Sequence, residues 1–145
     1  MFNGNKILFI GNGGVGKTQI IRNIVGYNFE KRYIPTSGLQ YYQNDTYVLI
    51  DRSGQEMPFE VSRDEIDLLN DVDEIILCYP CDQYSSLFLD VWLAYIKLLN
   101  KPYKIFVTKN DIDVHTSIAK KRNKLLNSLG VQQVFVTAKR PNIGM

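Results

Sequence analysis

Short apolar segments alternate along the chain with longer segments in which apolar residues recur every three or four positions. The short segments predict buried β-strands, and the longer ones predict amphipathic helices. The expected strands are residues 5–10, 39–43, 46–50, 73–79, 103–107 and 134–137, and the expected helices are residues 17–27, 64–70, 84–100 and 116–129. This order is typical of an α/β fold in which helices flank a mostly parallel sheet. The polar stretches 28–38 and 51–63 are assigned no strand.

Three local patterns make more specific structural predictions. Asn44 and Asp45 separate two expected strands and predict a hairpin turn. In residues 84–100 the apolar side chains of one helical face are expected to be buried, and Trp92 beside them to pack in or near the core. The residues of that face are Leu87, Val91, Tyr95 and Leu98. In residues 116–129 a basic cluster is expected to face solvent, namely Lys120, Lys121, Arg122 and Lys124.

Residues 11–18, Gly-Asn-Gly-Gly-Val-Gly-Lys-Thr, match the phosphate-binding pattern G-x-x-x-x-G-K-[ST] between an expected strand and an expected helix. Glycines let backbone N–H groups approach phosphate oxygens, and the helix N-terminus adds the positive end of its dipole. Lys17 can reach the β- and γ-phosphates, and the Thr18 hydroxyl can bind Mg²⁺. The expected phosphate-binding residues are Gly13, Gly14, Val15, Gly16, Lys17 and Thr18. The alternative is an ordinary glycine-rich turn.

Asp51 directly follows the expected strand 46–50, at the end of the strand where ligands bind in parallel sheets. Its carboxylate can hold Mg²⁺ there, through a water molecule. Gly54 can offer its N–H to a γ-phosphate, and Gln55 can orient an attacking water. The alternative for this segment is a plain polar turn.

Residues 108–111, Thr-Lys-Asn-Asp, follow the expected strand 103–107. The Asp111 carboxylate can accept hydrogen bonds from N1–H and the 2-amino group of guanine. Adenine lacks this pair of donors, so the carboxylate selects guanine, and the stem of Lys109 can lie across the base. The loop 137–139 can present a backbone N–H to guanine O6. The expected base-binding residues are Thr108, Lys109, Asp111, Thr137, Ala138 and Lys139; the alternative for Asp111 is a helix N-cap.

Composition limits the class of protein. The 145 residues suggest one domain, 1–145, with a sizeable core. A net charge of +2 without long runs of like charge argues against nucleic acid or an anionic membrane as a partner. The sequence shows no bilayer-spanning segment, signal peptide or lipidation motif, so we expect a soluble protein without membrane anchor in the cytoplasm or nucleus. The two cysteines, Cys78 and Cys81, are expected to be reduced thiols; a redox or half-zinc site is the alternative.

Together, the P-loop, Asp51–Gln55, Thr108–Asp111 and the final Thr-Ala-Lys resemble the small GTPases of the Ras superfamily, in the family's order and over essentially the whole chain. The resemblance implies a P-loop NTPase fold that binds GTP and GDP with Mg²⁺. It also implies an effector, an exchange factor and an activating protein as partners. Residues 28–36 look most like the Ran branch, the nuclear-transport GTPases, with Rab-type proteins as the alternative.

The resemblance also assigns roles to individual residues. Thr36 matches the threonine that binds Mg²⁺ and the γ-phosphate. Phe29 matches the aromatic that packs edge-on against guanine, and Tyr33 the tyrosine that closes over the γ-phosphate. Gly13 matches the glycine that leaves room for an arginine finger. The catalytic residues implied are Gln55, Lys17 and Thr36, and the metal ligands are Thr18, Thr36 and Asp51.

Four departures from the family pattern qualify these expectations. Arg52 and Ser53 stand where Thr-Ala is usual, which is expected to place a cation and a hydroxyl beside the γ-phosphate. Thr108 replaces the commoner Asn, and the stretch between Thr36 and Asp51 is shortened. The chain stops soon after Lys139, without the family's last helix. Because a parallel sheet needs both faces covered, we expect exposed apolar surface beside helix 17–27, covered by a homodimer or another partner, or else low stability.

Three functions remain open from the sequence. The leading one is a Ran-like switch that slowly hydrolyses GTP and needs an activating partner, because no arginine finger is evident apart from Arg32. The second is a nucleotide-binding module, or decoy of transport partners, with little hydrolysis. The third is a nucleotide kinase, for which the sequence shows neither an acceptor pocket nor an arginine-rich lid.

Overall fold

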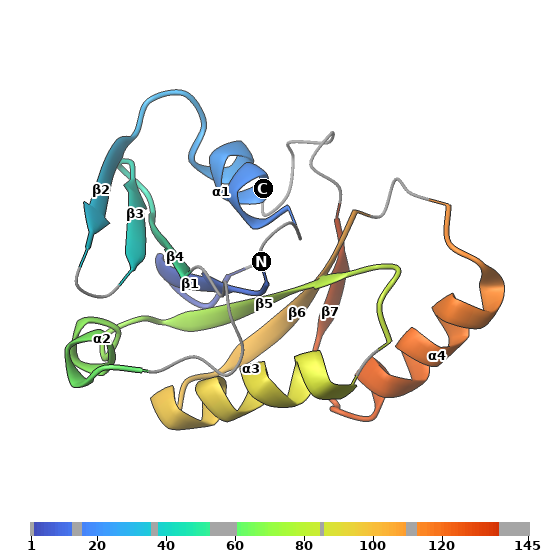
Figure 1. Cartoon of the computed structure of the whole chain (residues 1–145). Helices are drawn as coiled ribbons and strands as arrows, with labels where there is room; N and C mark the ends of the chain where they lie inside the picture. Colours follow the sequence, from blue (N-terminus) through green and yellow to red (C-terminus); the bar gives the residue numbers. More distant parts are fainter. Residues whose placement is uncertain are drawn as a thin grey trace.

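A seven-stranded sheet with helices on both faces forms the protein (Figure 1). The computed structural model describes residues 2–12, 16–35, 38–52, 61–84, 86–109 and 113–136. Its elements are β1 (Lys6–Ile10), α1 (Lys17–Val25), β2 (Glu30–Ile34), β3 (Leu39–Gln43), β4 (Val48–Arg52), α2 (Arg63–Leu68), β5 (Glu74–Pro80), α3 (Ser86–Leu99), β6 (Tyr103–Thr108), α4 (Thr116–Asn127) and β7 (Gln133–Phe135). The expected α/β fold class is confirmed.

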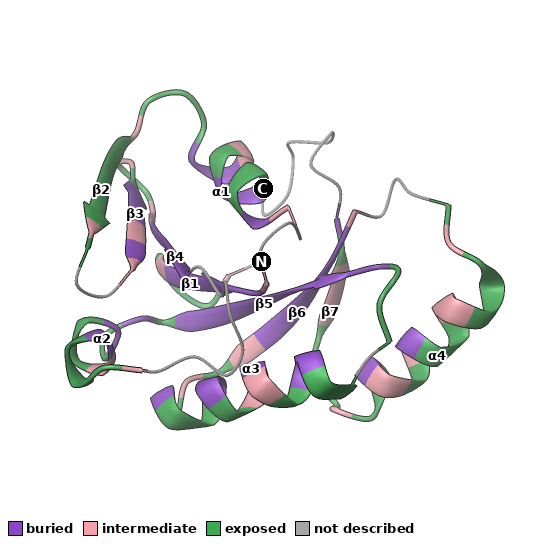
Figure 2. Cartoon of the chain, in the orientation of Figure 1, coloured by how far each residue is buried: buried purple, intermediate pink, exposed green. Residues whose placement is uncertain are grey.

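The strand order is β2-β3-β4-β1-β5-β6-β7. The strands β4, β1, β5, β6 and β7 are parallel, whereas β3 runs antiparallel to both β2 and β4. Figure 1 shows α1 on one face of the sheet and α2, α3 and α4 on the other. The central strands are therefore covered on both faces, which explains their nearly continuous apolar sequences. Figure 2 shows β5 buried along its length and β2 largely exposed.

The hairpin predicted at Asn44 and Asp45 is confirmed, because β3 and β4 pair in antiparallel register on either side of it. The Asn44 side-chain oxygen accepts hydrogen bonds from the backbone N–H groups of Thr46 at 2.9 Å and Tyr47 at 2.6 Å. This side chain thereby stabilises the turn itself. The strand after the turn ends at Arg52 rather than at Ile50, so Asp51 and Arg52 belong to the sheet.

The predicted buried face of α3 is wrong in part. Leu87 is 68% exposed and Leu98 is 52% exposed. The buried side chains of the helix are Phe88, Leu89, Trp92, Tyr95, Ile96 and Leu99. The helix is apolar on two faces, and the face with the large aromatic side chains is the one that packs on the sheet. Although α3 is the longest described helix, none in the described ranges has the length and apolar character to cross a bilayer.

The basic cluster on α4 is only partly solvent-facing. Lys120, Lys121 and Lys124 are exposed as predicted, but Arg122 is buried. Its guanidinium donates to the backbone oxygen of Cys81 and lies 5.6 Å from the ring centre of Phe135. Arg122 therefore ties α4 to the loop after β5.

The sheet face that carries α1 is also covered by the start of the chain. The Phe2 ring packs against Phe9, Phe106 and Tyr47, with centroid distances of 5.8–6.3 Å. Phe9 and Phe106 are fully buried. The expectation of bare apolar surface is therefore wrong for the part of this face that the structure describes; residues 137–145 lie outside it.

A buried ion pair lies on the same sheet face. Lys104 Nζ is 3.2 Å from Glu74 Oε2, and both side chains are at most 5% exposed. The backbone N–H and side-chain amide of Asn3 also donate to Glu74, at 3.2 and 3.0 Å. Hydrogen bonds of this kind compensate the desolvation of a buried carboxylate. The first residues of the chain thus complete a polar cluster as well as an apolar one.

Candidate functional site

Lys17, Thr18 and Asp51 meet at one edge of the sheet. The Lys17 ammonium lies 2.9 Å from Asp51 Oδ1, and the Thr18 hydroxyl donates to Asp51 Oδ2 at 3.1 Å. The parallel register pairs Phe9 of β1 with Asp51 of β4, so both strands end at this edge. The loop after β1 leads into α1, which brings its first two residues to the carboxylate. The structure therefore brings these three predicted site residues together, and their assigned roles stay predictions.

The start of α1 has the properties of an anion site. Gly16 precedes the helix with φ +90°, in the left-handed region that favours glycine. No side chain caps the helix, and its first turn contains no acidic residue. The backbone N–H groups of a first helical turn lack partners within the helix and carry the positive end of its dipole. An anionic oxygen would satisfy these groups.

The side chains present also fit a hard divalent cation. Within the described ranges, no group of three or more His, Cys, Asp and Glu side chains could hold a metal alone. Magnesium does not need such a group, since it commonly takes one or two protein oxygens and completes its shell with water and phosphate oxygens. The Thr18 hydroxyl and the Asp51 carboxylate are oxygen ligands at hydrogen-bond distance from each other.

The charge balance suits a magnesium–nucleotide complex. Lys17 and Asp51 have side chains only 7% exposed, so each charge needs a partner. In this structure the two neutralise each other. A bound complex would bring a cation for the carboxylate and anionic oxygens for the ammonium, and so could compensate both charges separately.

Arg52 does not lie beside the phosphate site as expected. Successive side chains of a strand point to opposite faces, and Arg52 follows Asp51 directly. Its guanidinium pairs with Glu65 of α2, with Nε–Oε2 and Nη2–Oε1 distances of 3.1 and 3.3 Å. Tyr95 of α3 donates its hydroxyl to the same carboxylate. The expectation is wrong because β4 extends through Arg52 and turns this side chain toward α2 and α3.

The three residues form a buried polar cluster, here called the switch clamp: Arg52, Glu65 and Tyr95. Each is at most 7% exposed. Burial, and then the negative charge of Glu65, raise the pKa of the Tyr95 hydroxyl. The neutral phenol therefore remains available as a donor. The switch clamp joins the end of β4 to α2, that is, the two ends of the segment that contains Gly54 and Gln55.

A second contact joins α3 to the phosphate-binding loop. The fully buried Trp92 donates from Nε1 to the side-chain oxygen of Asn12 at 2.9 Å. The prediction that Trp92 packs in the core is confirmed. The inner face of α3 thus contacts the loop before α1 through Trp92 and contributes Tyr95 to the switch clamp.

The start of the expected base-binding loop is fixed by Cys81. Its backbone N–H donates to the Thr108 carbonyl at 3.0 Å, and its thiol donates to the Lys109 carbonyl at 3.1 Å. Lys109 has φ +57°, which few side-chain-bearing residues adopt. The Thr108 hydroxyl is buried and makes no hydrogen bond among the residues that the structure describes. Cys81 therefore holds the backbone of Thr108 and Lys109 in place, a contact that sequence motifs did not reveal.

Both cysteines are free, buried thiols, as predicted. Burial raises the pKa of Cys78 to about 12, so its reactive thiolate is scarce at neutral pH. We expect an aromatic disulfide reagent to modify neither thiol in the native protein and both after unfolding in denaturant. A Lys120→Cys variant, exposed on α4, is the fast-reacting control. A native thiol that reacts as fast as this control would contradict the assigned burial.

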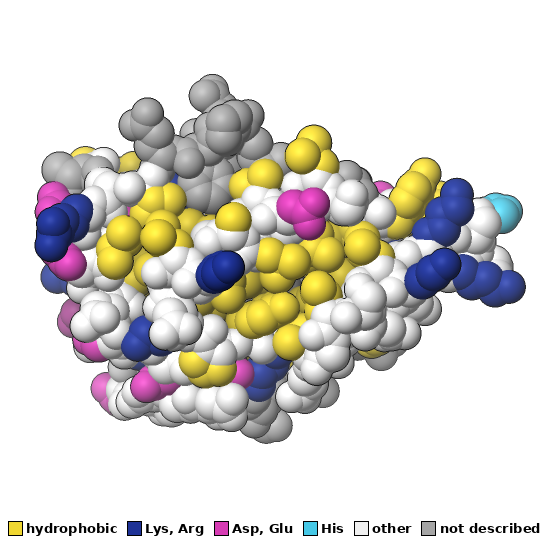
Figure 3. Space-filling view, turned by 90° about the horizontal axis from the view of Figure 1, so that it is seen from below, with side chains coloured by type: hydrophobic (Ala, Val, Ile, Leu, Met, Phe, Trp, Pro, Cys, Tyr) yellow, Lys and Arg dark blue, Asp and Glu magenta, His cyan; other side chains and the backbone are white. Residues whose placement is uncertain are grey.

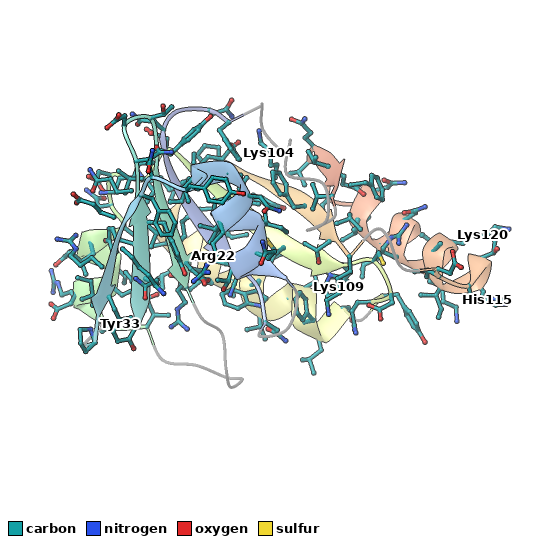
Figure 4. The ribbon with its side chains drawn as sticks, turned by 90° about the horizontal axis from the view of Figure 1, so that it is seen from above. Arg22, Tyr33, Lys104, Lys109, His115 and Lys120 are labelled. Carbon is teal, nitrogen blue, oxygen red and sulfur yellow. The ribbon has the colours of Figure 1, made fainter. Side chains whose placement is uncertain are left out.

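The remaining predicted residues fall into two groups. Phe29 lies against Tyr42, with ring centres 5.7 Å apart, and Tyr33 is exposed on the edge strand β2. Figure 4 shows Tyr33 at the left of the molecule and Lys109 near its middle, so these two residues of the expected site lie apart. Outside the described residues are Gly13, Gly14, Val15, Thr36, Ser53, Gly54, Gln55, Asp111, Thr137, Ala138 and Lys139. Their assigned roles stay predictions.

Comparison with known proteins identifies relatives of this arrangement. A family model described as Roc, "Ras of Complex, Roc, domain of DAPkinase", matches residues 6–113. The DnaJ homolog subfamily C member 27 of Homo sapiens is 30% identical in an alignment of 101 residues that covers 63% of this chain and 36% of that protein. The Rho-related protein racL of Dictyostelium discoideum is 31% identical in an alignment of 125 residues that covers 74% of this chain and 59% of that protein. The chain thus spans less than two thirds of either relative.

Solved structures share the fold. A mutant of S. thermophilus NFeoB bound to GDP matches with a TM-score of 0.66 and 22% identity, over 93% of this chain and 56% of that chain. The G domain of the T. maritima FeoB iron transporter matches with a TM-score of 0.60 and 19% identity, over 93% and 88% of the two chains. The elongation factor SelB of Methanococcus maripaludis, in complex with a GTP analogue, matches with a TM-score of 0.60 and 13% identity. The match covers 95% of this chain and 30% of that chain. At these identities the likeness establishes the fold alone.

Proposed function

The chain belongs to the Roc (Ras of Complex) domain family of Ras-like small GTPase domains, and from this premise we propose that it is a guanine-nucleotide switch that hydrolyses GTP. The observation that carries the proposal is the meeting of Lys17, Thr18 and Asp51 at the start of α1. Asp51 lies 33 positions after Thr18 and 34 after Lys17 in the sequence, and each residue has the chemistry that its proposed role needs. The likeness to GDP-bound NFeoB and to SelB with a GTP analogue supports guanine as the base.

Each residue of the site has its own proposed role. Lys17 and the first turn of α1 bind the β- and γ-phosphate oxygens, and Asp51 and Thr18 hold Mg²⁺. The metal would neutralise negative charge on the phosphates when bound. Asp111 selects guanine, and Gln55 orients the attacking water. Since phosphoryl transfer depends mainly on positioning and electrostatics, the rate without a partner is slow.

The switch clamp bears on the second candidate, a nucleotide-binding module without hydrolysis. From the sequence, that candidate is favoured by Arg52, by Ser53 and by the expected truncation. Because Arg52 pairs with Glu65 on the opposite face, Arg52 no longer supports it, whereas Ser53 lies outside the described residues. The hydrolysing switch is therefore the better supported of the two functions.

Single-turnover hydrolysis tests the proposed reaction. With protein in excess of GTP, Mg²⁺ present and the protein-free background rate subtracted, we expect a rate of roughly 10⁻⁴ to 10⁻² s⁻¹. A Gln55→Leu variant is expected to lose at least about tenfold in rate while binding GDP as before, because its role is to orient water. A rate equal to that of buffer would instead favour the binding module.

Two more specific proposals concern the protein's partners and its location in the cell. A Ran-like role in transport, with an exchange factor, an effector and an activating protein, rests on residues 28–36 alone. Location in the cytoplasm or nucleus is part of the same proposal. Binding of a Ran-type transport receptor that depends on GTP would support it, whereas GTP-dependent binding to a Rho-type effector would redirect it.

A further inference from the structure

The outer face of α3 carries a continuous row of apolar side chains. Leu87, Val91, Ala94 and Leu98 follow one another at spacings of four, three and four residues, which places them on one side of a helix. Leu87 and Leu98 are 68% and 52% exposed, Ala94 is exposed, and Val91 is partly buried. In Figure 1, α3 is the lowest element beneath the sheet, and Figure 3, from below, shows hydrophobic side chains across the middle of that face.

This row is not needed for the core of the protein. The inner face of α3 supplies six buried side chains, including Trp92 and Tyr95. A single exposed leucine is ordinary on a protein surface, whereas a continuous apolar row along a helix is a candidate contact surface. The row itself contains no charged residue. Asp90 and Lys97 lie beside it on the same helix, and both are exposed.

We propose that this row is a self-association surface, in which α3 of two copies pack antiparallel about a twofold axis. The order of side-chain sizes supports this geometry, because the two leucines stand at the ends and the smaller residues in the middle. An antiparallel pair places Leu87 against the partner's Leu98 and Val91 against the partner's Ala94. The small central residues let the helix axes approach closely, and mixed spacings of three and four residues suit a shallow crossing angle.

The charges beside the row are complementary in the same geometry. Asp90 and Lys97 are seven residues apart, close to two helical turns, so both lie on the same side of the row. When Leu87 lies opposite the partner's Leu98, Asp90 is level with a position two residues from the partner's Lys97. At a rise of 1.5 Å per residue, the two charged residues are therefore about 3 Å apart along the helix axis. The twofold axis creates this pair twice. A parallel twofold arrangement would instead place the Asp90 and Lys97 side chains of the two copies on opposite sides of the contact, so this pair would not form.

The size of the surface predicts a weak, reversible dimer. A 14-residue helix is about 21 Å long, so one row buries only a few hundred Å² on each copy. Stable interfaces bury about 800 Å² on each partner. We therefore expect dissociation constants in the range of roughly 10–500 µM, where each copy keeps its own fold.

Sedimentation velocity of the full chain from about 5 to 500 µM tests the proposal. The wild-type chain should shift from monomer to dimer, and Leu98→Glu should remain monomeric. Asp90→Lys and Lys97→Asp alone should each weaken association about tenfold, since each replaces two attractive pairs by two repulsive ones. The double variant D90K/K97D should restore it, because the pairs are re-formed with their charges exchanged.

Matched controls separate this contact from a general effect of charge. Asp45→Lys on the β3–β4 turn and Lys120→Asp on α4 change the net charge equally at exposed positions. They should leave association unchanged, and circular dichroism should show all variants folded. A wild-type chain that stays monomeric at 500 µM would overturn the proposal. A dimer insensitive to Leu98→Glu, or single reversals that the double variant does not rescue, would equally overturn it.

Discussion

Replacing Lys17 by alanine is expected to weaken the binding of GDP by about 100-fold. The Lys17 ammonium is held at the start of α1, 2.9 Å from Asp51, where it can reach the phosphates of a nucleotide. Loss of a charge-assisted hydrogen bond costs about 1.5–3 kcal/mol, and 1.4 kcal/mol corresponds to a tenfold change in affinity. Fluorescence titration with a labelled GDP measures the effect directly.

The control for this variant is Lys6→Ala. Lys6 also pairs with an aspartate, Asp71, at 2.7 Å, but this pair is exposed and lies at the opposite end of β1. The Lys6→Ala variant should bind GDP as tightly as the wild-type chain. If Lys17→Ala binds GDP within threefold of wild type, the phosphate-binding role of Lys17 is wrong.

Replacing Glu65 by alanine is expected to lower the free energy of unfolding by about 3–5 kcal/mol. The change leaves the buried Arg52 guanidinium without its carboxylate and removes the acceptor of the Tyr95 hydroxyl. Such a loss is a large part of the stability of a small domain. Urea unfolding followed by circular dichroism measures the change, and Asp67→Ala, exposed on the same helix, is the matched control.

A double variant distinguishes a buried charge from a simple loss of packing. Arg52→Met with Glu65→Leu removes both charges and keeps similar volumes, so it should be markedly more stable than Glu65→Ala. A Glu65→Ala variant destabilised by less than 1 kcal/mol would show that the switch clamp does not hold α2. The same result would weaken the argument that Arg52 is turned away from the site.

The central part of the site could be predicted from sequence because two general rules fix it. The glycine-rich pattern places Lys17 and Thr18 at the start of a helix, and parallel strands bring Asp51 to the same edge of the sheet. The hairpin at Asn44 followed in the same way from local turn chemistry. Neither inference required knowledge of how distant side chains pack.

The errors arose where tertiary contacts decide. Glu30–Ile34 is a charged and largely exposed segment, and it forms β2 only because β3 provides a pairing partner. The helix α3 is apolar on two sides, so periodicity could not identify which side packs on the sheet. Arg52 was misplaced because β4 extends two residues beyond its apolar segment.

One signal in the sequence could have identified the switch clamp. An arginine next to a buried strand needs an acidic partner, and Glu65 lies in the next polar helix. The contacts of Cys81 with Thr108 and Lys109 left no such signal, because they depend on how two loops meet. Motifs therefore located the groups that act on a ligand better than the groups that position them.

Competition between nucleotides for the purified chain tests the central claim most directly. A fluorescent GDP analogue is bound in the presence of Mg²⁺ and displaced with unlabelled GDP or with ADP. We expect GDP to displace it at a concentration at least 100-fold lower than ADP does. Equal displacement by ADP, or no binding of the analogue at all, would contradict the assignment of this chain as a guanine-nucleotide switch.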